Sequence, residues 1–101
     1  MVNKKNFIVE YSKQSLKNAK EIVSYLQKKF TEKEVNKFYK ALNDFEKIII
    51  IYPTLYSESK KKSIRRAVLS KVLSVYYSTD KNKISIIAIF DNRWEETSKI
   101  D

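Results

Sequence analysis

The sequence contains no cysteine, no histidine and no glycine, and only one proline. The absence of cysteine excludes disulfide bonds and thiolate metal sites. The absence of histidine excludes imidazole metal ligands, a Ser-His triad and the most common general base. Without glycine no glycine-rich phosphate loop can form, and tight turns must use Asn, Asp or Ser. Any catalysis would therefore depend on carboxylate, Tyr, Lys or Arg side chains, and we expect neither a metal ion nor a cofactor.

Long hydrophobic runs are absent as well. The longest aliphatic run, Ile48 to Ile51, is far shorter than a signal-peptide core or a membrane span. We therefore expect a cytoplasmic protein with no membrane partner. The 101 residues, 43% of them hydrophobic, suit one small domain over residues 1–101.

Basic residues are abundant: 21 Lys and Arg stand against 12 Asp and Glu, which gives a net charge of +9. Such an excess favours polyanionic partners, although a genome that uses lysine on every surface would produce it too. Between Lys60 and Lys83 eight residues are basic and only Asp80 is acidic. Neighbouring strands could gather part of this cluster into a phosphate-binding patch, or the lysines could protect an exposed sheet edge from aggregation.

The spacing of apolar residues predicts a strand followed by two helices. Residues 7–11 alternate as in a short strand. Helical spacing then predicts a helix over about residues 15–30, and Thr31 with Glu34 forms a capping-box pattern that begins a second helix. The predicted inward stripes are Leu16, Ala19, Val23, Leu26 and Phe30 on the first helix, and Val35, Phe38, Leu42, Phe45 and Ile49 on the second. So short a break between helices predicts an antiparallel hairpin.

Pro53 ends the second helix, and the polar segment 54–63 is predicted to be a loop. Three strands are predicted over residues 64–69, 71–78 and 83–90, with a turn at 80–82 and a polar tail from about residue 91. Helices segregated from the later strands imply an α+β fold. We expect the helical hairpin to pack on a mainly antiparallel four-stranded sheet.

Candidate binding residues lie on the late strands. Only three basic residues are arginines, whose planar fork lysine cannot copy. Arg65 and Arg66 are candidates for phosphate contact, or for ion pairs with residues such as Glu10 or Asp91. Arg93 with Trp94 could hold a phosphate and stack a base, or Trp94 could anchor the chain end to the core. Tyr76 and Tyr77 are predicted to lie on opposite faces of one strand, one in the core and one on the open side.

The element order and three motifs together resemble the RelE/ParE toxins of type II toxin–antitoxin systems. The motifs are Ile64-Arg65-Arg66-Ala67-Val68-Leu69-Ser70-Lys71, then Val75-Tyr76-Tyr77, then Ile86-Ile87-Ala88-Ile89-Phe90-Asp91-Asn92-Arg93. The similarity runs from about Phe7 to Arg93. Tyr11-Ser12 before the first helix and Pro53 after the second also fit.

The resemblance implies a growth-inhibiting toxin, often linked to plasmid stabilisation, that a small antitoxin with an acidic toxin-binding segment neutralises. It implies either cleavage of mRNA on the ribosome, as in RelE-like members, or poisoning of DNA gyrase, as in ParE-like members. In the nuclease case the catalytic candidates are Arg93 and Lys71. The candidate residues for partner or nucleic-acid binding are Arg65, Arg66, Lys71, Tyr76, Arg93 and Trp94.

Two departures favour the ParE-like alternative. The middle strand has Leu73 and Ser74 where RelE-like nucleases carry an arginine, and Trp94 rather than a tyrosine follows Arg93. A ribonuclease without histidine needs several such groups to activate the 2′-hydroxyl and stabilise the phosphorane. The sequence thus predicts a toxin that binds gyrase. A ribosome-dependent endonuclease and a non-toxic basic binding module of the same fold remain alternatives.

Overall fold

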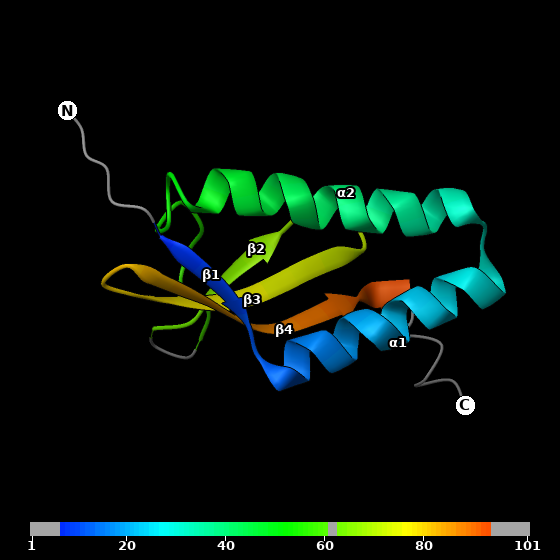
Figure 1. The fold of residues 1–101 in the computed structure, drawn as a ribbon, viewed down its shortest axis with the longest axis horizontal. Coiled ribbons are helices and arrows are strands. Elements are labelled where there is room, and N and C mark those ends of the chain that lie inside the picture. Colours follow the sequence, from blue (N-terminus) through cyan, green and yellow to red (C-terminus); the bar gives the residue numbers. More distant parts are fainter. Residues whose placement is uncertain (1–6, 61–62, 94–101) are drawn as a thin grey trace.

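The computed structural model describes residues 7–60 and 63–93. Strand β1 (Ile8–Tyr11) is followed by helices α1 (Lys13–Lys29) and α2 (Glu32–Ile49), and then by strands β2 (Arg65–Val68), β3 (Leu73–Asp80) and β4 (Lys83–Asp91). The strands form one sheet in the order β1-β4-β3-β2. β1 runs parallel to β4, while the β4–β3 and β3–β2 pairs are antiparallel. The predicted α+β fold with a mainly antiparallel sheet is therefore confirmed (Figure 1).

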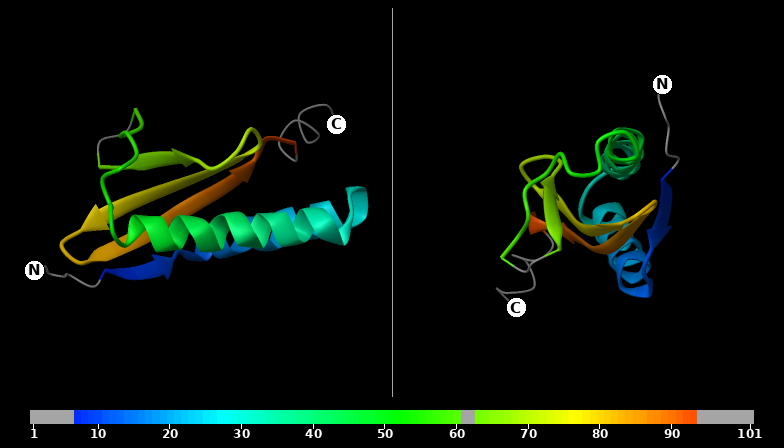
Figure 2. Two further views of the ribbon diagram at one scale, coloured as in Figure 1. Left: turned by 90° about the horizontal axis from the view of Figure 1, so that it is seen from above. Right: turned by 90° about the vertical axis from the view of Figure 1, so that its left-hand side faces the viewer.

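The helices form an antiparallel hairpin on one side of the twisted sheet (Figure 2). Figures 1 and 2 place α2 over the middle of the sheet, whereas α1 follows the edge of β4. Side chains from both helices and from β2, β3 and β4 form one hydrophobic core. The five predicted core positions of α2, Val35, Phe38, Leu42, Phe45 and Ile49, are all buried.

The predicted stripe of α1 was correct at Ala19, Val23 and Leu26, which lie in or against the core, but wrong at its two ends. Leu16, which we expected in the core, is 56% exposed, and Phe30 is 41% exposed. Of the predicted stripe only Leu26 is fully buried, and Ser15, Asn18 and Ile22 share the buried face with it.

Hydrogen bonds to the edge of β4 explain why Leu16 faces outward. β1 pairs with β4 only from Lys83 to Ile86. Beyond that point the Ser12 hydroxyl donates to the carbonyl of Ile87 over 2.9 Å, and the Asn18 side-chain oxygen accepts from the amide of Ile89 over 3.1 Å. Buried backbone groups must be paired, so the polar residues of α1 turn inward in place of a longer β1. Apolar periodicity alone carries no information on this requirement.

The capping box predicted for α2 is also wrong. Thr31 is the N-cap residue, but its side chain makes no capping hydrogen bond. Only its carbonyl accepts, from the amide of Glu34 over 3.0 Å. The Glu34 carboxylate turns instead toward the end of β4.

The hairpin between β3 and β4 forms without glycine, as predicted. Asp80 pairs with Lys83, so Lys81 and Asn82 make the turn. Lys81 has a φ of 49°, a left-handed conformation that is costly for a residue with a Cβ. The register shifts between Tyr76 and Tyr77, which leaves Ile87 as the extra residue of a β-bulge on β4. β4 ends at Asp91, one residue later than predicted. We had assigned Asp91 to the polar tail, but this residue still pairs with Leu73 and its carboxylate is buried.

We predict that Asn18→Ala lowers the free energy of unfolding by about 1–3 kcal/mol, because the buried amide of Ile89 loses its acceptor. Urea unfolding followed by circular dichroism measures the change. Asn36→Ala, an exposed asparagine of α2, is the matched control and should change stability by less than about 0.5 kcal/mol. Equal effects of the two substitutions would show that Asn18 does not support the sheet edge.

Candidate functional site

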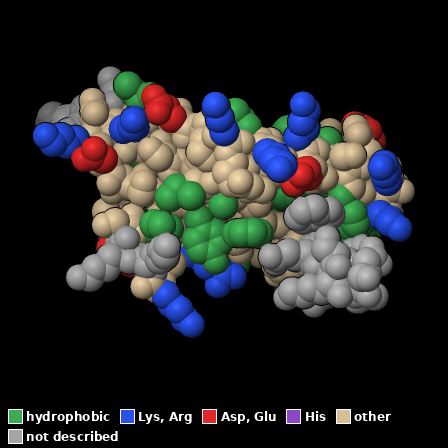
Figure 3. Space-filling view, turned by 90° about the horizontal axis from the view of Figure 1, so that it is seen from below, with side chains coloured by type: hydrophobic (Ala, Val, Ile, Leu, Met, Phe, Trp, Pro, Cys, Tyr) green, Lys and Arg blue, Asp and Glu red, His purple; other side chains and the backbone are tan. Residues whose placement is uncertain are grey.

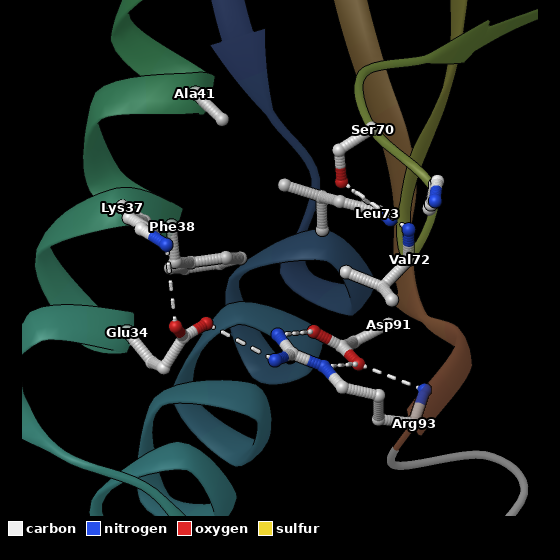
Figure 4. A pocket seen from close by; sticks show the side chains of 10 residues that line it. Glu34, Lys37, Phe38, Ala41, Ser70, Val72, Leu73, Asp91 and Arg93 are labelled. Carbon is white, nitrogen blue, oxygen red and sulfur yellow. Dashed lines mark hydrogen bonds and ion pairs between the residues drawn. The ribbon is translucent and has the colours of Figure 1, made fainter.

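A cleft of about 350 Å³ opens between the first half of α2, the β2–β3 loop and the end of β4. Figure 4 shows Phe38 and Leu73 against it, with Glu34 on the helix facing Arg93 at the end of β4. The lining residues are Glu34, Lys37, Phe38, Ala41, Ser70, Lys71, Val72, Leu73, Asp91 and Arg93. Two predicted site residues, Lys71 and Arg93, therefore line the same cleft.

Arg93 is held by two carboxylates. Its Nε and one terminal nitrogen donate to the two oxygens of Asp91 over 3.1 and 2.9 Å, and its other terminal nitrogen donates to Glu34 over 3.1 Å (Figure 4). The guanidinium carbon also lies 4.8 Å from the centre of the Phe30 ring. Asp91 is only 1% exposed, so Arg93 compensates a buried charge. The ion pair with Asp91 that the sequence offered as an alternative for the arginines forms at Arg93.

The partners of the Arg93–Glu34 ion pair both remain charged at neutral pH. The hydrogen bond to Asp91, followed by that to Glu34, raises the pKa of Arg93 above its already high value. The hydrogen bond from Arg93 lowers the pKa of the Glu34 carboxyl, and Lys37, 3.5 Å away, adds to this effect. A general acid or base works best with a pKa near the operating pH. The shifts at Arg93 and Glu34 move away from that range, so the geometry favours binding over proton transfer.

The other basic candidates do not converge on this cleft. The Arg65 guanidinium donates to the carbonyl of Tyr56 over 2.7 Å. Arg66 lies across from Tyr76 in the β2–β3 register and is exposed. Lys83 forms an ion pair with Glu10 on β1. The basic cluster over residues 60–83 is thus spread over several surfaces. Of the phosphate-binding patch that the sequence suggested, the part around Arg66 remains a candidate. Lys61, Lys62 and Trp94 lie outside the described residues.

Arg66 and Tyr76 lie on the face of the sheet opposite the helices. A hollow of about 650 Å³ there is lined by Ser57, Glu58, Ser59, Lys60, Arg66, Val68 and Tyr76. The Tyr76 ring contacts Phe90 edge to face, with 5.5 Å between the centroids. Tyr77 is fully buried, so the predicted division of the two tyrosines between core and open face is confirmed. Figure 3, the view from below, shows hydrophobic side chains gathered in one patch with basic side chains at its margins.

Sequence reasoning missed the α2 half of the cleft. Glu34 had been assigned to a capping pattern and Phe38 to the core stripe of α2, while Lys37 and Ala41 had no assigned role. The spacing of 59 residues between Glu34 and Arg93 leaves no local signal. No group of three or more His, Cys, Asp or Glu side chains that could hold a metal ion occurs in the described part of the chain. None of its helices is long and apolar enough to cross a membrane.

Neither a protein-family model nor a curated protein matches this chain. Solved structures do. A chain of the chromosomal ParDE TA system from P. aeruginosa superposes with a TM-score of 0.72 at 11% identity, covering 87% of this chain and 98% of that one. YoeB from Staphylococcus aureus, solved as a dimer, gives 0.58 at 20% identity, covering 84% and 95%. A chain of the E. coli DinJ–YafQ toxin–antitoxin complex gives 0.59 at 15% identity, covering 88% and 96%.

These similarities extend over nearly the full length of the neighbouring chains. The chain therefore has the RelE/ParE-like toxin fold: two helices packed on a four-stranded, mostly antiparallel sheet. The identities of 11–20% define the fold and leave the biochemical activity to other arguments.

We predict that Glu34→Gln lowers stability at neutral pH and that the difference from the unsubstituted protein shrinks in acid. The folded-state pKa of Glu34 lies below its usual 4.5, so the stabilisation by Arg93 is complete above that pH and is lost as the pH falls through the lower folded value. Urea unfolding from pH 7 to pH 3 measures the difference. Glu32→Gln removes a neighbouring exposed acid as the control, and an equal pH dependence of both variants would contradict the assignment.

Proposed function

We propose that this protein is the toxin of a type II toxin–antitoxin system, neutralised by a small antitoxin with an acidic toxin-binding segment. The fold carries the proposal: the ParDE and DinJ–YafQ assemblies, described by name as toxin–antitoxin systems, supply chains of this fold with 96–98% of their length matched. The charge of +9 supports an acidic partner.

We further propose that the toxin acts in the ParE-like manner, by binding DNA gyrase, without covalent chemistry of its own. The chain has no histidine or cysteine. Arg93, the candidate catalytic cation, already balances Asp91 and Glu34, and Lys71 beside it is exposed. A transition state gains most from preorganised groups directed at developing charge. In the described cleft the guanidinium is directed at carboxylates of the protein itself, which supports a structural role.

The residues proposed for target contact are Arg66, Tyr76 and Lys71. Arg66 and Tyr76 line the hollow on the open sheet face, and among the described residues the Arg66 guanidinium donates to the Ser74 hydroxyl alone, at 3.5 Å. Arg65 and Arg93 are proposed to position the chain, because each donates to groups of the fold. Trp94 is proposed as a partner contact on the basis of the sequence alone.

Expression from an inducible promoter should arrest growth, and co-expression of the cognate antitoxin, which we expect to be encoded by a short acidic open reading frame beside this gene, should restore it. Purified protein should then inhibit gyrase supercoiling at concentrations near those that stop growth. Arg66→Gln with Tyr76→Ala should weaken inhibition by about tenfold or more, since they remove a charged contact and an aromatic contact. Lys81→Gln in the exposed hairpin turn is the control and should leave inhibition unchanged.

Arg93→Ala requires a stability measurement beside the activity assay, because it leaves Asp91 buried without its partner. Lys71→Gln tests the cleft without this complication. Codon-specific mRNA cleavage in a translation extract, lost in Lys71→Gln while gyrase is unaffected, would contradict the gyrase proposal and support the ribosome-dependent endonuclease. Normal growth and normal supercoiling together would support the non-toxic binding module.

A further inference from the structure

An apolar segment, residues 48–57, leads from the last turn of α2 toward β2 (Figure 1). No charged residue lies between Lys47 and Glu58, and this uncharged stretch is the longest in a sequence of which 33% is charged. Ten large hydrophobic side chains are exposed in the described part of the chain, and five of them lie here: Ile48, Ile50, Ile51, Tyr52 and Leu55. Half of these exposed apolar side chains are therefore concentrated in one short segment.

Four of the exposed side chains follow one another at helical spacing. Ile48, Ile51, Tyr52 and Leu55, which we call the apolar stripe, stand at positions i, i+3, i+4 and i+7. The amides of Ile51 and Tyr52 donate to the carbonyl of Ile48 over 3.1 and 2.9 Å. Ile51, Tyr52 and Leu55 are 64%, 61% and 56% exposed. This is the spacing with which a helical surface lies in a hydrophobic groove of another protein.

The other side of the segment is anchored in the core. Ile49 is fully buried, and the buried Tyr77 donates from its hydroxyl to the Pro53 carbonyl over 2.9 Å. The Tyr56 ring contacts that of Tyr77, with 6.4 Å between the centroids, and the Tyr56 carbonyl accepts from Arg65 over 2.7 Å. The backbone of the apolar stripe is thus fixed, so a partner does not have to order it on binding.

Burial of one face and exposure of the other is unusual for a segment without charges. Helices that are hydrophobic on all sides are buried on all sides. Contiguous apolar patches that stay in contact with water mark interaction sites. A partner that covers the apolar stripe would complete the burial of this segment.

The apolar stripe is continuous with the surface proposed for target contact. A hollow of about 330 Å³ joins Ile48 and Tyr56 to Val68 of β2. Val68 is exposed and also lines the hollow of Arg66 and Tyr76 on the open sheet face. An apolar centre with charged and polar side chains at its margin is the usual composition of a protein–protein interface.

We infer that the apolar stripe is the main contact with the target protein and lies in an apolar groove on that protein. The inference rests on the proposed function, which names gyrase as the target, and it adds the side chains that carry most of the binding energy. An uncharged centre fits a protein, whereas a nucleic-acid backbone requires cations. A second copy of the chain would bring Lys47 and Lys60, at the two ends of the segment, toward those of its partner. Lipid chains offer nothing to the hydroxyl groups of the adjoining hollow.

Binding of the full chain to each purified gyrase subunit, measured by biolayer interferometry, tests the inference beside supercoiling inhibition. Leu55→Glu places a charge in the apolar stripe and should weaken binding and inhibition by about tenfold or more. Leu55→Met keeps an apolar side chain and should bind as the unsubstituted protein does. Leu16→Glu on α1 is the control, matched in exposure at 56%, and should change binding by less than about twofold.

A second position guards against a defect in folding. Leu55 and Leu16 are equally exposed, so the urea midpoints of Leu55→Glu and Leu16→Glu should agree. Ile51→Glu should reproduce the loss of binding, because Ile51 belongs to the same stripe.

Four results overturn the inference. Equal gyrase inhibition by Leu55→Glu, Ile51→Glu and the unsubstituted protein removes the apolar stripe from the target contact and leaves the gyrase proposal intact. Loss of neutralisation by the antitoxin with unchanged inhibition assigns the stripe to the antitoxin. Leu55-dependent self-association in analytical ultracentrifugation assigns it to a second copy. Leu55-dependent sedimentation with phosphatidylglycerol vesicles assigns it to a membrane surface.

Failure of the gyrase proposal is recognised separately. If the unsubstituted chain arrests growth but leaves gyrase unaffected, another protein is the target. Growth arrest must then still be lost in Leu55→Glu and Ile51→Glu and kept in Leu16→Glu, and arrest by all three variants overturns the inference. An unsubstituted chain that does not arrest growth overturns both proposals.

Discussion

The arrangement of the helices follows from one constraint: β1 covers only half of the outer edge of β4. β1 is only four residues long and stops pairing at Ile86, so the remaining edge of β4 needs other hydrogen-bond partners. Ser12 and Asn18 supply them. Because Asn18 must face the strand, the whole of α1 turns about its axis, which brings Ser15 inside and moves Leu16 to the outer surface. The edge of the sheet thereby determines which residues of α1 lie in the core and which lie on the surface.

An ion pair and a hydrogen bond fix α2 relative to the same sheet. Glu34 near its start binds Arg93 beyond β4, and Glu46 near its end accepts from Tyr11 of β1. The central part of α2 is held by Phe38, Leu42 and Phe45 in the core. The cleft therefore lies on a helix that is anchored near both ends, which suits a surface that binds without rearrangement.

The sequence predicted the parts of this fold that depend on regular spacing. The α2 stripe was correct at every position because each apolar residue there faces the core and no backbone group competes for the same face. The order of elements, the glycine-free turn after Asp80 and the division between Tyr76 and Tyr77 were also correct. The placement of Leu16 in the α1 stripe and the role of Glu34 were not, since both depend on hydrogen bonds to β4 or to Arg93 just beyond it, across a long separation in sequence. The candidate site was recovered only at Lys71 and Arg93, with no signal for the α2 wall opposite them.

The ladder between β1 and β4 joins Ile8 to Lys83, almost the two ends of the described chain. The ribosome makes β1 long before β4, its neighbour in the described sheet, so β1 can pair only after β4 has left the exit tunnel. The helical hairpin is local and can form early, whereas the salt bridge from Arg93 to Glu34 needs a residue made 59 positions later. A chain truncated just before Arg93 would lose the salt bridge to Glu34 while keeping both described helices. The native topology can therefore form only after β4 has been synthesised.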